Sequence, residues 1–156
     1  MMFFLRDRDK KLKLIILGYE YMMSEVVEDL NWLNIEIIAS DLKNNWSSSG
    51  SYLRTFDLVE MRSWFSDIQE GKQVSKRLDF IEHELSFEYY EEKQELSVNL
   101  DYGLHPNGEG YRANVDSEYK MIFSLSAVNM DTLLATLKTL IDKFPIRFFQ
   151  SDNSIN

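Results

Sequence analysis

The chain has 156 residues, of which 44% are hydrophobic and 13% aromatic, so it can bury the core of one domain and is not disordered as a whole. Its 26 acidic and 17 basic residues give a net charge of −9. This balance argues against a general nucleic-acid binder, because such a protein needs a basic face. The absence of cysteine excludes disulfides, thiolate metal sites and a cysteine nucleophile.

The sequence predicts a soluble, cytoplasmic protein. The apolar start at Met1–Leu5 gives way to a charged run at residues 6–9, so it is too short for the core of a signal peptide. No other apolar run approaches the roughly 20 residues that cross a bilayer. We therefore expect no membrane association. The pattern fits one domain over residues 1–156, with a core at about 11–148 and frayed termini.

Three strands are predicted before the first helix. They cover residues 11–21, 32–40 and 46–54, where branched and aromatic residues are frequent and apolar and polar residues alternate in the second strand. The serine-rich centre of the third strand is a weak β-former, which predicts a bulge or a mobile edge there. Thr55, or alternatively Asp57, is then expected to cap a helix over about residues 56–70 that Gly71 ends.

Three more strands and a second helix are predicted after a polar connection at 73–77. The strands cover residues 81–90, 95–102 and 118–125, and the helix runs over about 130–144. Residues 103–117 contain a proline and several glycines and are expected to form an irregular, mobile loop. The order βββ-α-βββ-α with short links predicts an α+β fold, in which one antiparallel sheet of about six strands packs against two amphipathic helices.

The hairpin predicted at residues 81–102 carries acidic side chains on its outer face. If its apolar faces are paired, Glu84 lies opposite Asp101 and Glu88 lies opposite Ser97. Like charges at opposite positions destabilise a sheet, and no lysine stands opposite the glutamates of this hairpin. One interpretation is an acidic patch that binds a basic partner, and the other is a solvated face protected from aggregation by its charge.

No pattern in the chain indicates catalysis. His83 is expected on the apolar face of its strand as a hydrogen-bonded structural residue, and His105 is expected to be solvated in its loop. Two histidines without a carboxylate at helical spacing give no metal-site signature. The serine run lacks a nucleophile-elbow pattern, and residues 107–110 do not form a phosphate-binding motif. The residues therefore predict no enzyme, no metal and no cofactor.

A series of positions in a characteristic order runs along most of the chain. They are Leu17-Gly18-Tyr19-Glu20, Asp29, Asn31-Trp32-Leu33, Ile35-x-Ile37, Trp46, Leu53-x-Thr55, Leu58, Trp64-Phe65, Phe80-Ile81-Glu82-His83-Glu84-Leu85-Ser86-Phe87, Phe123-Ser124-Leu125-Ser126 and Phe144-Pro145-x-Arg147. Through these positions the chain, from about residue 14 to residue 147, resembles the WapI family of bacterial immunity proteins. These proteins accompany polymorphic toxins that are delivered by cell contact. The serine-rich run 47–51 and the loop 107–110 depart from the family pattern.

The resemblance implies an immunity protein that binds a cognate toxin domain in the cytoplasm of the producing cell. It implies no catalytic residue, and it implies that binding blocks the active site of the toxin or its access to substrate. The partner is expected to be the C-terminal domain of a toxin and basic in charge. A nuclease is one candidate, because an acidic inhibitor complements a phosphate-binding groove.

Two surfaces are candidates for the toxin contact. They are the acidic hairpin face, with Glu82, Glu84, Glu88 and Asp101, and the serine-rich loop, with Ser47, Ser48, Ser49 and Ser51. Two other functions stay open. One is a small interaction or regulatory module without a toxin, and the other is a small-molecule-binding domain with His83, Glu84 and Tyr89 around a pocket. The sequence predicts no oligomeric state.

Overall fold

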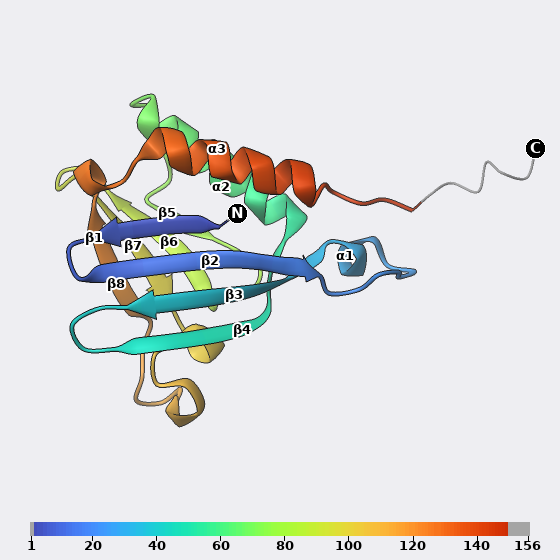
Figure 1. Cartoon of the computed structure of the whole chain (residues 1–156), viewed down its shortest axis with the longest axis horizontal. Coiled ribbons are helices and arrows are strands. Elements are labelled where there is room, and N and C mark those ends of the chain that lie inside the picture. Colours follow the sequence, from blue (N-terminus) through green and yellow to red (C-terminus); the bar gives the residue numbers. More distant parts are fainter. Residues whose placement is uncertain (1, 150–156) are drawn as a thin grey trace, which may run out of the picture.

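The computed structural model describes residues 2–149, and within them the chain forms two four-stranded antiparallel sheets and three helices (Figure 1). The first sheet contains, in spatial order, β1 (Phe3–Asp7), β2 (Lys10–Tyr19), β3 (Trp32–Ser40) and β4 (Asn45–Arg54). The second contains β5 (Arg77–Asp79), β6 (Leu85–Tyr90), β7 (Glu95–Leu100) and β8 (Tyr119–Ser124). The helices are α1 (Val27–Leu30), α2 (Thr55–Gln69) and α3 (Met130–Lys143).

The α+β class is confirmed, but the prediction of one sheet of about six strands with two helices is wrong in detail. The run before residue 8 forms β1, which pairs with β2 and buries Phe3 and Leu5. The polar connection before residue 80 contributes the short strand β5, and the segment before β3 contributes the single turn α1. Since α2 carries the chain away from β4, the strands on either side of this helix belong to separate sheets (Figure 1).

Two local predictions about strand pairing are confirmed. In the β6–β7 hairpin, Leu85 pairs with Leu100 and Phe87 with Val98, as the apolar alternation predicts. In the β3–β4 pair, the register shifts between Gly50 and Leu53, so a bulge lies at the end of the serine-rich run and β4 forms an edge of its sheet. The strand expected from residue 81 begins only at Leu85, because residues 81–84 form a turn.

The core lies between the two sheets and the helices. Phe3 of β1, Phe65 of α2 and Phe87 of β6 meet with ring centroids 5.4–6.0 Å apart, so one aromatic group joins both sheets to a helix. The buried leucines of α3 face the same core, and α3 packs along α2 (Figure 1). Asn129 caps α3 by accepting a hydrogen bond from the Thr132 amide at 3.1 Å.

At the start of α2, Asp57 takes the place of Thr55, the first of the two predicted caps. The Asp57 side chain accepts hydrogen bonds from the Arg54 amide (2.8 Å) and guanidinium (3.1 Å), so the alternative cap satisfies this helix end. The Thr55 hydroxyl instead donates to Asn31 at 2.8 Å, in a network described below. No helix in the described part of the chain is long and apolar enough to cross a membrane.

Candidate functional site

Three of the predicted contact residues lie together at the open end of the β6–β7 hairpin. Glu82 and Glu84 are in the turn before β6, and Asp101 directly follows β7. The Asp101 amide donates to the Glu84 carbonyl oxygen at 2.9 Å, which confirms that these two residues lie opposite each other. All three side chains are partly exposed. We call Glu82, Glu84 and Asp101 the acidic cluster.

The acidic cluster is electrostatically uncompensated. Burial raises the pKa of Glu84, and the nearby charges of Glu82 and Asp101 add to this effect. Within residues 2–149, no hydrogen-bond partner reaches Glu84 Oε2 although this atom is buried, and none of the three carboxylates forms an ion pair. The cluster therefore carries negative charge that the described part of the molecule does not neutralise.

Glu88 lies apart from the acidic cluster and is only 7% exposed. Its Oε1 accepts from Lys120 Nζ at 2.6 Å and from Asn99 Nδ2 at 3.0 Å, and Arg77 lies 3.4 Å away. Ser97 lies opposite Glu88 in the hairpin, as predicted, and the cations that reach this glutamate come from β5 and β8, which flank the hairpin. Burial acts to raise the pKa of Glu88, but the bonds from Lys120 and Asn99 outweigh it and hold the pKa below its ordinary value.

The polar side chains around Glu88 form a closed network on the outer face of the second sheet. Asn99 and Ser97 are bonded to each other at 2.7 Å, and both are buried. Arg77 binds Glu118 through two nitrogens, at 3.0 and 2.7 Å, and also reaches Ser86 at 2.9 Å. Because these groups satisfy one another, this face stabilises the sheet and presents little free charge.

Tyr52 of β4 connects the acidic cluster to the serine-rich strand. Its ring lies over Gly50 and its hydroxyl against Gly103, where an added Cβ would come within 2.5 and 2.3 Å of the tyrosine. Burial raises the pKa of Tyr52, and the charges of Glu84 and Glu82 raise it further. The edge of the first sheet and the acidic cluster are thus neighbours in the fold, although some 30 residues separate them in sequence.

The four predicted serines do not form one surface. Ser48 donates to the Gly103 carbonyl at 2.5 Å, and Ser51 donates to Glu20 Oε2 at 2.7 Å, so both are used inside the molecule. Ser47 and Ser49 are exposed on the face of β4 opposite to Ser48, and they pair with Ile38 and Glu36. Successive side chains of a strand point to opposite faces of a sheet, and the register shift between Gly50 and Leu53 interrupts this alternation at Ser51.

The two histidines lie in surroundings opposite to those expected. His83 is exposed in the turn before β6, because the strand whose alternation would bury it starts two residues later. His105 is only 7% exposed, and its Nδ1 accepts from the Asn107 amide at 3.0 Å. Its ring lies edge-on to Tyr111 and Tyr119 at 5.0 and 6.0 Å. Both predictions are therefore wrong, and neither histidine has a position that indicates catalysis.

The loop that follows β7 is more ordered in its contacts than its composition predicts. It contains two 3-10 turns, Tyr102–Leu104 and Gly108–Gly110. The Leu104 carbonyl accepts from Trp46 Nε1 at 3.0 Å, which attaches the loop to β4. The Tyr111 hydroxyl donates to Asp101 at 2.6 Å, and this bond raises the pKa of Tyr111 to about 12. The loop therefore forms one side of the acidic cluster.

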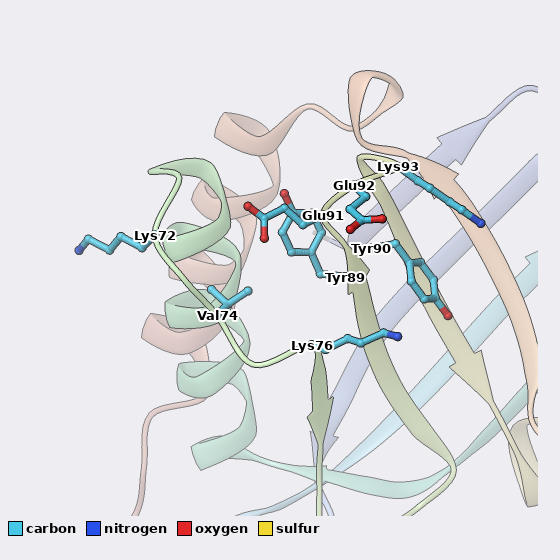
Figure 2. Close-up of a pocket in the computed structure, with 8 residues that line it drawn as sticks. All are labelled: Lys72, Val74, Lys76, Tyr89, Tyr90, Glu91, Glu92 and Lys93. Atoms are coloured by element: carbon cyan, nitrogen blue, oxygen red, sulfur yellow. The ribbon is translucent and has the colours of Figure 1, made fainter.

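A hollow of about 420 Å³ lies between the segment after α2 and the tip of the β6–β7 hairpin (Figure 2). Its lining includes Val74 and Tyr89, and Figure 2 shows Lys72 and Lys93 pointing away from its centre. His83 and Glu84 do not line it, so the structure does not bring together the three residues of the small-molecule alternative. Residues 2–149 contain no group of three or more potential metal-ligating side chains.

Asn31 stands at the centre of a network formed by residues that are distant in sequence. Its amide nitrogen donates to the carbonyls of Val27 and Arg147, both at 2.9 Å. Its amide oxygen accepts from the Thr55 hydroxyl and from the Arg147 amide, both at 2.8 Å. Asn31 is fully buried and all of these bonds are made, so it fixes three chain segments to one another.

Arg147 extends this network to the segment after β2. Its guanidinium donates to the carbonyls of Tyr21 at 2.6 Å, Met22 at 3.1 Å and Leu30 at 2.8 Å. It also lies 3.7 Å from the ring centroid of Tyr19, whose hydroxyl donates to the Pro145 carbonyl at 2.6 Å. The positions that carry the family resemblance at the two ends of the chain thus meet in the folded molecule.

A model of the immunity protein WapI-like family matches residues 2–145. The chain belongs to this family. A comparison with curated proteins finds no match. The WapI-like match covers both sheets and all three helices, and it confirms the resemblance carried by the ordered residues. Membership of the WapI-like family indicates an immunity protein that neutralises a toxin and binds its cognate toxin.

Proposed function

We propose that this WapI-like protein binds the C-terminal domain of its cognate toxin through the acidic cluster and covers the active or substrate-binding surface of that domain. The observation that carries the proposal is the charge of Glu82, Glu84 and Asp101, which are partly exposed and form no ion pair within residues 2–149. Grouped like charges destabilise the free protein, so a partner that supplies lysine or arginine relieves this cost on binding.

The charge of the whole chain supports a basic partner. With a net charge of −9, the protein attracts a positively charged surface and accelerates its association. A nuclease toxin fits this requirement, because an enzyme that binds nucleic acid needs a basic groove for the phosphates. We therefore infer that the acidic cluster, with the exposed Ser47 and Ser49 of the neighbouring β4 as secondary contacts, occupies such a groove.

Inhibition on this proposal is a binding event in the cytoplasm of the producing cell and needs no catalytic residue, metal or cofactor. Family membership favours the toxin over an unrelated regulatory partner. We also infer that residues 1–156 act as a single domain. The buried side chains of both sheets and of α2 and α3 belong to one continuous cluster, which supports this inference.

Charge reversal in the acidic cluster tests the proposal. In the variant Glu82→Lys/Glu84→Lys, we expect the affinity for the toxin domain encoded beside this gene to fall at least tenfold at low salt, as for charged interface pairs. The matched control is Glu91→Lys/Glu92→Lys, which makes the same charge change at the exposed tip of the hairpin. Equal affinities of the two variants would contradict the proposed contact surface.

A further inference from the structure

The segment between β2 and α1 exposes a group of apolar side chains at one end of the molecule. Met22 is 90% exposed and Met23 is 87% exposed, and Tyr21 and Val26 beside them are exposed as well. Figure 1 shows this segment projecting beyond the end of the first sheet. We call Tyr21, Met22, Met23 and Val26 the apolar tip. These side chains contribute little to the core, so their exposure calls for another explanation.

The backbone of the apolar tip is held in place although its side chains are free. Arg147 binds the carbonyls of Tyr21 and Met22, and the buried Asn31 fixes Arg147 in turn. At the other end of the segment, the Ser24 hydroxyl accepts from the Val26 amide at 3.0 Å and donates to Asp29 at 3.3 Å. A surface held in this way loses less conformational entropy on binding.

Carboxylates surround the apolar tip in sequence. They are Glu20, Glu25, Glu28 and Asp29, and residues 14–42 contain no lysine or arginine. Arg147, which reaches the same segment, uses its guanidinium on backbone carbonyls. The result is an apolar centre with an acidic rim, which is the arrangement of a protein-binding surface.

We propose that the apolar tip inserts into an apolar depression that is ringed by lysine or arginine on the cognate toxin domain. This inference rests on the proposed function and adds a second contact surface to it. Methionine suits the role, because its flexible, polarisable side chain adapts to irregular depressions. The carboxylate rim complements the basic ring and rejects an anionic membrane or the like-charged rim of a second copy.

The edge strand β4 connects the apolar tip to the acidic cluster. Ser51 of β4 binds Glu20 beside the tip at 2.7 Å. The hydroxyl of the next residue, Tyr52, lies against Gly103, two residues after Asp101. One toxin domain can therefore contact both surfaces, with the acidic cluster supplying charge and the apolar tip supplying buried area.

The test replaces the two methionines and measures affinity for the toxin domain encoded beside the gene. In Met22→Ser/Met23→Ser we expect at least tenfold weaker binding, while the far-ultraviolet circular dichroism and the melting temperature stay unchanged. The matched control is Leu42→Ser/Val59→Ser, which removes side chains that are 86% and 42% exposed elsewhere. Leu42 follows the far end of β3, away from the tip. We expect the control to bind within twofold of the wild type.

A second pair of variants tests the rim. Glu25→Lys/Glu28→Lys should weaken binding at least tenfold at low salt and less at high salt, whereas Glu91→Lys/Glu92→Lys should have a much smaller effect. If the wild type binds, and the methionine and rim variants both bind as tightly as the wild type, the apolar tip is not a contact. The proposed function then stands without it. If the wild type itself does not bind, both proposals fail.

Two further outcomes would overturn the inference in favour of another occupant. A concentration-dependent dimer of the wild type that Met22→Ser/Met23→Ser abolishes in size-exclusion chromatography would show that the tip binds a second copy. Wild-type binding to vesicles of phosphatidylserine and phosphatidylcholine that the same variant loses would show that the tip binds lipid. On our proposal the wild type neither dimerises through the tip nor binds these vesicles.

Discussion

Two glutamates of the same hairpin stand in opposite electrostatic surroundings. Glu84 lies among carboxylates and has an unpaired buried oxygen, and its pKa is raised from an ordinary value of 4.5. Glu88 lies between Lys120 and Arg77, and its pKa is lowered from the same value. The first charge therefore costs stability, whereas the second contributes to it.

Replacing Glu84 by glutamine should stabilise the free protein at neutral pH. A group with a raised pKa contributes stability below its unfolded pKa of about 4.5 and loses it as the pH rises through the folded pKa. At pH 7 the variant Glu84→Gln should therefore gain about 0.5 kcal/mol in free energy of unfolding, a modest figure because solvent screens this partly exposed group. Urea unfolding at pH 7 and pH 4 measures it, and a gain that is equal at both values would contradict the assignment.

Replacing Glu88 should have the opposite effect. A group with a lowered pKa contributes stability above its unfolded pKa and loses it as the pH falls through the folded pKa. Glu88→Ala removes the buried carboxylate that accepts from Asn99 and Lys120 and lies beside Arg77, and it should cost about 2 kcal/mol at pH 7, less at pH 3.5.

The exposed Glu92 provides the control, because Glu92→Ala should change the free energy of unfolding by less than about 0.5 kcal/mol. Urea unfolding measures both variants. Since Glu88 is buried, Glu88→Ala should also leave the affinity for the toxin domain unchanged under conditions in which the protein stays folded. A Glu88 variant with normal stability and weakened binding would place this residue in the interface and contradict its structural role.

At the scale of elements, the contact between Tyr52 and Gly103 attaches the loop after β7 to the edge of the first sheet. An alanine Cβ at position 103 would lie 2.3 Å from the Tyr52 hydroxyl. Gly103→Ala should therefore displace Tyr52 and cost about 1 kcal/mol of stability. The same substitution at Gly110, a glycine of the same loop with open space around its Cβ position, should cost less than about 0.5 kcal/mol.

The variant Tyr52→Phe tests whether the tyrosine hydroxyl causes the stability cost of Gly103→Ala. In a Tyr52→Phe background the clashing hydroxyl is absent, so Gly103→Ala should cost less than in the wild type. Urea unfolding of the wild type, the two single variants and the double variant gives the coupling free energy between positions 52 and 103. A cost at position 103 that is the same in both backgrounds would show that the hydroxyl contact does not hold the loop.

The pairing of β6 with β7 could be predicted because it depends on local information. Apolar residues alternate in both strands, and the observed register places the apolar residues of one strand opposite those of the other. The surroundings of Glu88 could not be predicted in this way. Its partners Arg77 and Lys120 lie in strands whose places beside the hairpin are set by the whole fold, and β5 has only three residues. β1 was missed because its apolar run is short and charged residues follow it.

The residues of the candidate surfaces could also be predicted only where local sequence patterns place them. The positions of Glu84 and Asp101 follow from the hairpin register, so this pair could be found from sequence. The approach of Tyr52 to them, and of Arg147 to the segment after β2, joins parts of the chain that no local pattern connects. Residues 150–156, where a frayed end was expected, lie outside the described part of the chain.

At the scale of the whole molecule, we propose that the acidic cluster and the apolar tip provide two complementary means of binding one basic protein. We expect variants of the two surfaces to change different rate constants of binding. Charge reversal in the acidic cluster should mainly slow association and reduce its salt dependence, whereas removal of the methionines should mainly speed dissociation. Both effects require that the partner is the cognate toxin that family membership implies.

The most direct test is therefore a titration of the full-length protein with a catalytically inactive form of the toxin domain encoded beside its gene. We predict a one-to-one complex with a dissociation constant on the order of 10⁻⁹ M or lower, and restored growth of cells that express the active domain together with this protein. A titration without binding at micromolar concentrations, together with no restored growth, would contradict the central claim.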